Sequence, residues 1–173
     1  AQRLASFDTL DGNGQADEIP LAATTQPPGW NSRLDIFLGS AFITNIDTRR
    51  YLNDGVVDVT FNKPEYREAL RYLNSLYAGG LIAPESLTQD QDGIDRMLRS
   101  EEVTVGAVPQ GWMSAFVDTI GKEGTRFDQY VTVPPLEGPG GHREMPYYAY
   151  QLAPGKCIIT AAAEDPELAL RWC

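Results

Sequence analysis

The sequence contains few of the residues from which histidine- and thiol-based centres are built. Its single histidine is His142, and its two cysteines are Cys157 and Cys173. One histidine gives a His-centred triad or metal cluster little to draw on, and the cysteines lack the spacing of a zinc site or a redox pair. We interpret them as two buried thiols, with a disulfide between Cys157 and Cys173 as the alternative.

Basic residues and long apolar runs are also scarce. The chain has 14 Lys and Arg residues against 24 Asp and Glu residues, a formal net charge of -10, which opposes binding to nucleic acid or to anionic membranes. No apolar run has the length of a membrane span, and residues 1–7 lack the basic and apolar segments of a signal peptide. The chain has no initiator Met and stops at Cys173 inside a helical pattern. We therefore expect a piece of a longer protein, so the missing signal carries no information about the compartment.

What the sequence does contain is typical of a globular α/β domain. Its 173 residues match one domain, and its 42% hydrophobic and 10% aromatic residues suffice for a core. Apolar periodicity predicts helices at 32–41, 63–78 and 92–99 and from Pro166, and strands or extended segments at 56–61, 103–108, 131–133, 147–150 and 157–160. Residues 22–33 are expected to form a loop. This order predicts one α/β unit over residues 1–173, with a small mixed sheet flanked by helices.

The stretch 62–87 predicts a helix whose start, buried face and end are all visible in the sequence. Asn62 can cap the helix, Pro64 suits its first turn, and Glu65 stands three residues after the cap. Gly79 and Gly80 supply a left-handed stop. The expected buried face consists of the apolar residues at three- and four-residue spacing, namely Tyr66, Ala69, Leu70, Leu73, Leu76 and Tyr77. We interpret this helix as a support of the core.

Residues 8–20, AspThrLeuAspGlyAsnGlyGlnAlaAspGluIlePro, carry the sharpest chemical signal. Oxygen-bearing side chains at alternate positions around a glycine are what calcium requires of a short loop. With Gly14 at the sixth position of an EF-hand-type loop, Thr9 takes the first position and Pro20 the twelfth, so Glu18 has to supply the bidentate carboxylate. The predicted structural calcium site comprises Thr9, Asp11, Asn13, the Gln15 carbonyl, Asp17 and Glu18. The alternative is a solvated acidic turn.

Four stretches in order carry a resemblance to a known family. They are the loop AspGlyAsnGlyGlnAlaAspGluIlePro, the central helix LysProGluTyrArgGlu with its turn AlaGlyGlyLeuIleAlaPro, the loop ProProLeuGluGlyProGlyGlyHisArg, and the segment GluAspProGluLeuAlaLeuArgTrp. Together they resemble the family-1-like extracellular solute-binding proteins of bacterial ABC importers, in particular the lipoproteins that bind oligosaccharides such as alginate. The resemblance runs over nearly the whole chain.

The resemblance implies a periplasmic-binding-protein-like type II fold, in which two α/β lobes close on a ligand across a hinge. This chain would be the second lobe of a protein that delivers a carbohydrate to the membrane subunits of an ABC importer, without catalysis. The full-length protein would be an extracellular lipoprotein or periplasmic. In alginate-binding relatives the calcium loop uses Asp, Asn, Asn, a carbonyl, Asp and Glu, and Thr9 in place of the first Asp is the departure here.

Recognition of a sugar requires flat apolar faces and a few amide or acid groups for its hydroxyls. The candidates for these roles are Trp112, Gln110, Trp30 and Tyr148. Trp112 comes first because it follows the end of the strand expected at 103–108, and ligands of open α/β sheets collect outside the carboxyl ends of strands. Each aromatic has packing in the core as its alternative, and Trp172 is assigned to packing.

Two other classes of function compete with a solute receptor. A glycoside hydrolase needs two carboxylates at a defined separation, and the candidates by number are Asp90, Asp92, Asp95, Glu101 and Glu102. Their spacing is that of a solvated face. A calcium-stabilised interaction module similar to dockerins is the other alternative, although dockerins are far shorter and use the loop twice.

Overall fold

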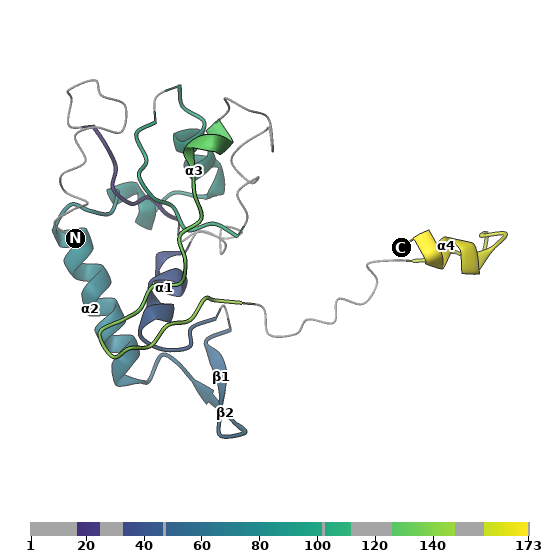
Figure 1. Cartoon of the computed structure of the whole chain (residues 1–173), viewed down its shortest axis with the longest axis horizontal. Coiled ribbons are helices and arrows are strands. Elements are labelled where there is room, and N and C mark those ends of the chain that lie inside the picture. The colour runs from purple at the N-terminus through teal and green to yellow at the C-terminus, as the bar shows by residue number, and fades with distance from the viewer. Residues whose placement is uncertain are drawn as a thin grey trace.

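The computed structural model describes residues 17–24, 33–46, 48–101, 103–111, 126–147 and 158–172. Figure 1 shows α1 and α2 side by side, a two-stranded hairpin at one end of α2, and α4 apart from these elements. The elements in chain order are α1 (Leu34–Phe37), the 3-10 turn η3 (Gly39–Ala41), β1 (Arg50–Asn53), β2 (Val56–Val59), α2 (Pro64–Ala78), the 3-10 turn η4 (Pro84–Leu87), α3 (Gln91–Leu98), the 3-10 turn η6 (Arg126–Gln129) and α4 (Pro166–Trp172).

This mixture of helices with a small sheet confirms the predicted α/β class. The sheet of the described chain is narrower than the mixed sheet we expected, because it holds only the antiparallel pair β1 and β2. Within the described ranges, no helix combines the length and the apolar character that crossing a membrane requires.

The end of α2 follows the sequence prediction, whereas its start does not. Gly80 has a φ of 70°, and the amides of Gly80 and Leu81 donate to the carbonyls of Tyr77 at 3.0 Å and of Leu76 at 2.9 Å, the pattern of a Schellman motif. The predicted Asn62 cap is wrong. Lys63 occupies the N-cap with an extended backbone (φ −92°, ψ 145°) and no side-chain hydrogen bond, which places Asn62 one residue too early to reach the first free amides.

The buried face of α2 is narrower than the predicted six residues. Only Ala69 and Leu76 are buried, while Tyr66 and Leu73 are half-buried. Leu70 is 45% exposed and Tyr77 41% exposed. The helix packs on α1 and η3 along one side, and the stripe that it buries is correspondingly thin.

The centre of the described core is the short segment 19–24. On one side, the Ile19 amide donates to the Thr104 carbonyl at 2.7 Å and the Gly106 amide to the Ile19 carbonyl at 2.9 Å. On the other side, the Ala83 amide donates to the Leu21 carbonyl at 3.0 Å. Ala22 lies in one core cluster with Ala83, Ile94, Leu98 and Val105, and Ala23 lies in a second with Leu34, Leu76 and Ile82. Residues 22–24 form neither helix nor strand, as expected for the loop at 22–33, but they are buried, and their small side chains let neighbouring segments approach on both sides.

The hairpin and α3 agree with the sequence. β1 pairs with β2 in the register Leu52 to Val57 and Asn53 to Val56, and the turn between the strands has φ 49° at Asp54 and 81° at Gly55, as an Asp-Gly hairpin turn requires. The helix expected at 92–99 is α3, and Asp90 caps it by accepting from the Gly93 amide at 2.9 Å.

Other expected elements are shorter or missing in the described residues. The helix expected at 32–41 is the four-residue α1 followed by η3. The strand expected at 103–108 is reduced to a parallel bridge between Val105 and Ile19. Residues 131–133 and 158–160 form no strand, and Val131 and Ile158 are 84% and 77% exposed. The expected last helix is α4. Cys157 and Cys173 lie outside the described residues, and the packing expected for Trp172 stays a prediction.

Candidate functional site

A cavity of about 360 Å³ lies where the segment after Val105 leaves the core. Its described walls come from α1, residues 106–111, residues 130–136, and the pair Glu144 and Met145. Most of the lining is apolar or aromatic, as the walls of small-molecule sites are. Leu34, Phe37, Leu38, Val108, Pro109 and Leu136 are members of this apolar lining.

Gln110 is the predicted ligand residue that the structure places in this cavity. The pairing of Ile19 with residues 104–106 brings the chain to buried Pro109, directly before Gln110. The Oε1 atom of Gln110 accepts from the Gly111 amide at 3.0 Å, which fixes the side-chain amide. Its Nε2 atom is buried without a hydrogen-bond partner among the described residues. A buried donor without a partner costs about 1–3 kcal/mol, and a ligand oxygen would remove that cost.

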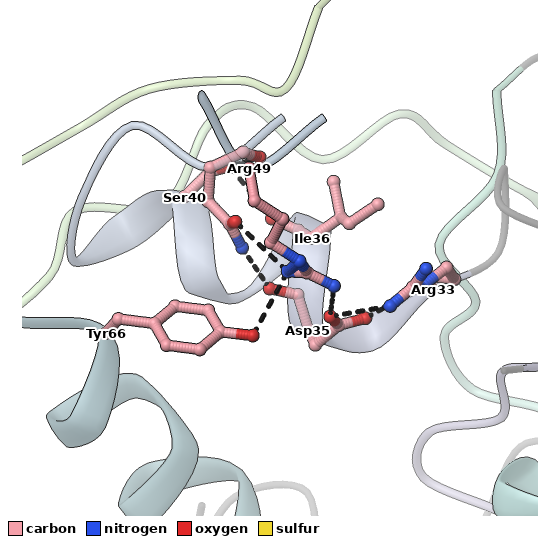
Figure 2. A network of polar contacts seen from close by, with 7 residues as sticks. Arg33, Asp35, Ile36, Ser40, Arg49 and Tyr66 are labelled. Atoms are coloured by element: carbon pink, nitrogen blue, oxygen red, sulfur yellow. Dashed lines mark hydrogen bonds and ion pairs between the residues drawn. The ribbon is translucent and has the colours of Figure 1, made fainter. Parts of the chain in front are cut away.

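The cavity wall formed by α1 is held in place by a polar network around Asp35 (Figure 2). The Asp35 carboxylate pairs with Arg33 at 3.0 Å and with Arg49. Arg49 also donates to the Tyr66 hydroxyl at 3.1 Å and lies over the Tyr66 ring, 5.6 Å from its centre. The Asn45 side chain donates to the Asp35 carbonyl. The network thus joins α1, Asn45, Arg49 and the first turn of α2.

The electrostatics of the network favour the charged form of Asp35. Burial opposes its ionisation, but the hydrogen bonds and positive charges of Arg33 and Arg49 outweigh burial, so the pKa of Asp35 lies below its ordinary value. Arg49 has a φ of 57°, a conformation that non-glycine residues rarely adopt. Its several side-chain contacts hold this left-handed residue where β1 begins.

Glu144 reaches the cavity through a contact that no local sequence pattern indicates. The loop 137–143 closes with a bridge between Glu137 and Arg143. Gly138 of this loop packs so closely on η3 that a Cβ there would lie 1.8 Å from the Ala41 carbonyl oxygen. Beyond the loop, Glu144 Oε2 accepts from the Thr44 hydroxyl at 2.6 Å, across one hundred positions of the sequence.

The other predicted sugar-binding residues are not placed by the structure. Trp112, Trp30 and Tyr148 lie outside the described residues. The sequence singled out Gln110 because it follows an apolar run and a proline, whereas it did not single out Glu144, which follows a glycine-rich turn with no periodicity around it.

The carboxylates considered for hydrolysis have structural or solvent-facing positions where they are described. Asp90 caps α3, Asp95 accepts from Gln91 Nε2 at 2.9 Å, and Asp92 and Glu101 are exposed. Glu102 lies outside the described residues. None of the four described carboxylates lines the cavity around Gln110.

The predicted calcium loop is described only at its end. Thr9, Asp11, Asn13 and Gln15 lie outside the described residues. Asp17 is exposed and Glu18 half-buried, and both come directly before Ile19, whose backbone is hydrogen-bonded on both its amide and its carbonyl. Within the described ranges no three His, Cys, Asp or Glu residues gather as a metal site would require. The two carboxylates have the hard oxygen donors that calcium prefers.

Comparison with known proteins relates this chain to carbohydrate receptors. No protein-family model matches the chain. It is 29% identical over 175 residues to the fructooligosaccharide ABC transporter substrate-binding protein FusA of Streptococcus pneumoniae serotype 4, a match that covers 98% of this chain and 30% of FusA. The chain thus spans about a third of the length of this curated relative.

Solved structures give the same result. The chain superposes on FusA in complex with kestose with a TM-score of 0.65 and 27% identity, over 84% of this chain and 28% of that one. An EF-hand mutant of FusA in complex with fructo-nystose gives a TM-score of 0.64 at 25% identity, over 84% of this chain and 28% of that one. A solute-binding protein of Bifidobacterium longum infantis that binds human milk oligosaccharides gives a TM-score of 0.62 at 30% identity, over 79% of this chain and 29% of that one. The resemblance to oligosaccharide-binding proteins of ABC transporters is confirmed.

Proposed function

We propose that this chain is one lobe of an extracytoplasmic solute-binding protein that delivers an oligosaccharide to an ABC importer. The observation that carries the proposal is the match of nearly the whole chain, 98%, to only 30% of a fructooligosaccharide-binding protein. A match of this kind is what one lobe of a larger receptor would give. The relatives are binding proteins, and we accordingly propose a role in binding without catalysis.

The cavity around Gln110 supports binding of part of a sugar. Apolar walls suit the C–H face of a sugar ring, and the fixed Gln110 amide offers a donor to a hydroxyl. A volume of about 360 Å³ is at the lower end of the range for small-molecule sites, roughly 300–1,000 Å³. In our proposal a second lobe provides the remaining contacts, and Trp112, two residues after Gln110, adds a stacking face.

We further propose that the ligand-loaded protein docks on the membrane subunits of the importer. Such a receptor works outside the cytoplasmic membrane, either anchored as a lipoprotein or free in a periplasm. The net charge of -10 is consistent with this assignment, since it disfavours nucleic acid as the ligand.

Calcium is the cofactor that we propose for residues 9–18. Asp17 and Glu18 fit a calcium site because they provide oxygen ligands immediately before the central segment 19–24. Together with Asp11, Asn13 and the Gln15 carbonyl they would hold the ion, and Thr9 would take the remaining position. When bound, the ion would neutralise the clustered carboxylates and fix the loop against the core. That a similar structure is an EF-hand mutant of FusA supports this proposal.

Isothermal titration calorimetry tests the proposed function. The two-lobe protein that contains this chain should bind at least one of kestose, fructo-nystose or a human milk oligosaccharide, whereas the 173-residue chain alone should fold and bind weakly or not at all. Micromolar binding by the isolated chain would contradict the two-lobe account. Failure of the two-lobe protein to bind any sugar of the panel would contradict the proposed class of ligand.

A further inference from the structure

Glu144 is the charged residue among the described residues that line the cavity. The rest of the described lining is apolar, aromatic or neutral polar. The Glu144 side chain is 25% exposed, so it is partly withdrawn from water. A carboxylate in an otherwise uncharged, mostly apolar wall is costly unless it is hydrogen-bonded, and its contacts therefore need an explanation.

One of the two Glu144 oxygens is firmly held. Oε2 accepts from the Thr44 hydroxyl at 2.6 Å and lies 3.3 Å from His142 Nε2. Oε1 has no hydrogen-bond partner among the described residues, although a carboxylate can accept several hydrogen bonds. One oxygen thus orients the group and the other stays available to a molecule in the cavity.

The group that orients Glu144 is itself rigid. The Thr60 hydroxyl donates to the Thr44 carbonyl at 3.0 Å, and Thr60 is fully buried at 0% exposure. The Ser40 hydroxyl donates to the next carbonyl, that of Asn45, at 3.1 Å. On the other side, the close contact of Gly138 with η3 fixes the loop that leads to Glu144. Both partners of the Thr44–Glu144 hydrogen bond therefore belong to well-anchored segments.

We propose that Glu144 contacts the ligand, accepting a hydrogen bond from a sugar hydroxyl through Oε1, and that it selects neutral over acidic sugars. The inference rests on the proposed function. Gln110 Nε2 is a donor without a partner in the described residues, and Glu144 is an acceptor. Sugar hydroxyls both donate and accept, so they satisfy both groups. A uronate or sialate carboxylate placed near Glu144 would be repelled, in a chain whose net charge is already -10.

Thr44 acts in this proposal as a positioning residue, because it touches Glu144 and is absent from the described cavity lining. Removing its hydroxyl should weaken sugar binding only as long as Glu144 is present. A merely structural role would weaken binding equally in both backgrounds. A double-mutant cycle of Thr44→Val with Glu144→Gln separates the two roles.

The test uses the two-lobe protein, titration calorimetry with kestose, and thermal melting. Glu144→Gln keeps the shape of the side chain and an oxygen for the Thr44 hydroxyl, but replaces the second oxygen by a donor. We expect a loss of affinity of about tenfold or more, the scale of a hydrogen bond to a charged group, with an unchanged melting temperature. Glu137→Gln is the matched control, since Glu137 is an exposed carboxylate of the adjacent loop 137–143 and does not line this cavity.

A uronic acid trisaccharide completes the test. The wild-type protein should prefer kestose to this acidic trisaccharide, and Glu144→Gln should reduce the preference. Unchanged kestose affinity in Glu144→Gln, or an equal loss in Glu137→Gln, would overturn this inference alone. If the wild-type protein binds no sugar of the panel, the proposed function falls and this inference falls with it.

Discussion

Replacement of Gly138 by alanine tests the contact that brings the loop 137–143 onto η3. A Cβ at position 138 would lie 1.8 Å from the Ala41 carbonyl oxygen and 2.8 Å from the Ala41 carbonyl carbon. Ordinary contact between such atoms starts near 3.4 Å, so loop and turn would have to separate by about 1.6 Å. The obstacle is backbone, which cannot rotate away as a flexible side chain can.

Gly140 provides a matched control two residues further along the same loop. A Cβ there meets nothing within 4 Å. Overpacking typically costs about 1–3 kcal/mol, and we expect Gly138→Ala to reduce the free energy of unfolding by this amount. Gly140→Ala should be neutral or stabilise the chain by about 0.4–1 kcal/mol, because alanine restricts the unfolded chain more than glycine does.

Thermal and urea unfolding of the 173-residue chain measure the difference between these two variants. For a protein of this size each kcal/mol corresponds to roughly 2–4 °C in Tm. A difference of about 2 kcal/mol should therefore separate the two melting temperatures by roughly 4–8 °C. Equal melting temperatures would show that the loop does not pack on η3, and would remove the support that this packing gives to the position of Glu144.

Three further predictions concern the metal loop, the stacking residue and the polar network. Calcium should raise the Tm of the chain by several degrees, and Asp17→Ala should abolish that rise because it removes a carboxylate ligand. Trp112→Ala in the two-lobe protein should weaken sugar binding by about 2 kcal/mol, the loss of an aromatic anchor, with little change in Tm. Because the pKa of Asp35 is lowered in the folded state, its contribution to stability should be present above the unfolded pKa of about 3.9 and be lost as the pH falls through the folded value.

Each of these predictions has a result that contradicts it. A melting curve that is unmoved by chelation would reduce the metal loop to an acidic turn. A Trp112→Ala variant that loses roughly 3–5 kcal/mol of stability with unchanged affinity would identify a core residue instead. For the network, Asp35→Asn should make the free energy of unfolding fall less steeply with pH below about pH 4. The same slope in the variant and in the wild type would show that Asp35 titrates normally.

The sequence predicted best those features that depend on neighbours in the chain. The end of α2 was predicted because Gly79 and Gly80 favour the stop of a helix, and the strand β2 was predicted because its residues alternate in the way a strand requires. The Asn62 cap failed because the N-cap lies one position later, at Lys63, which makes no side-chain hydrogen bond. These features depend on adjacent residues, and the error in the predicted helix start is one residue.

Features that depend on distant partners were harder to predict. Residues 131–133 have strand-forming side chains, yet a strand needs a second strand beside it. In the described chain β1 and β2 pair only with each other, and no strand pairs with residues 131–133. Segment 22–24 is buried, yet it resembles a loop in composition because its contacts require small residues. Glu144 accepts a hydrogen bond from Thr44 across one hundred positions of the sequence, so only the folded chain brings the two together.

The backbone pairing of segment 19–24 also sets the position of Gln110 in the cavity. Ile19 is matched with residues 104–106, and the Ala22 amide donates to the Ala107 carbonyl at 3.0 Å, so the offset between the two stretches fixes how far Gln110 extends beyond the core. A residue inserted between Ile19 and Ala22 would shift that offset and turn the side chains to opposite faces. Insertions before Asp17 would leave it intact. Insertions after Ile19 are therefore expected to displace Gln110, whereas insertions before Asp17 are expected to affect only the proposed calcium loop, a difference that single-residue insertions across 8–24 would test.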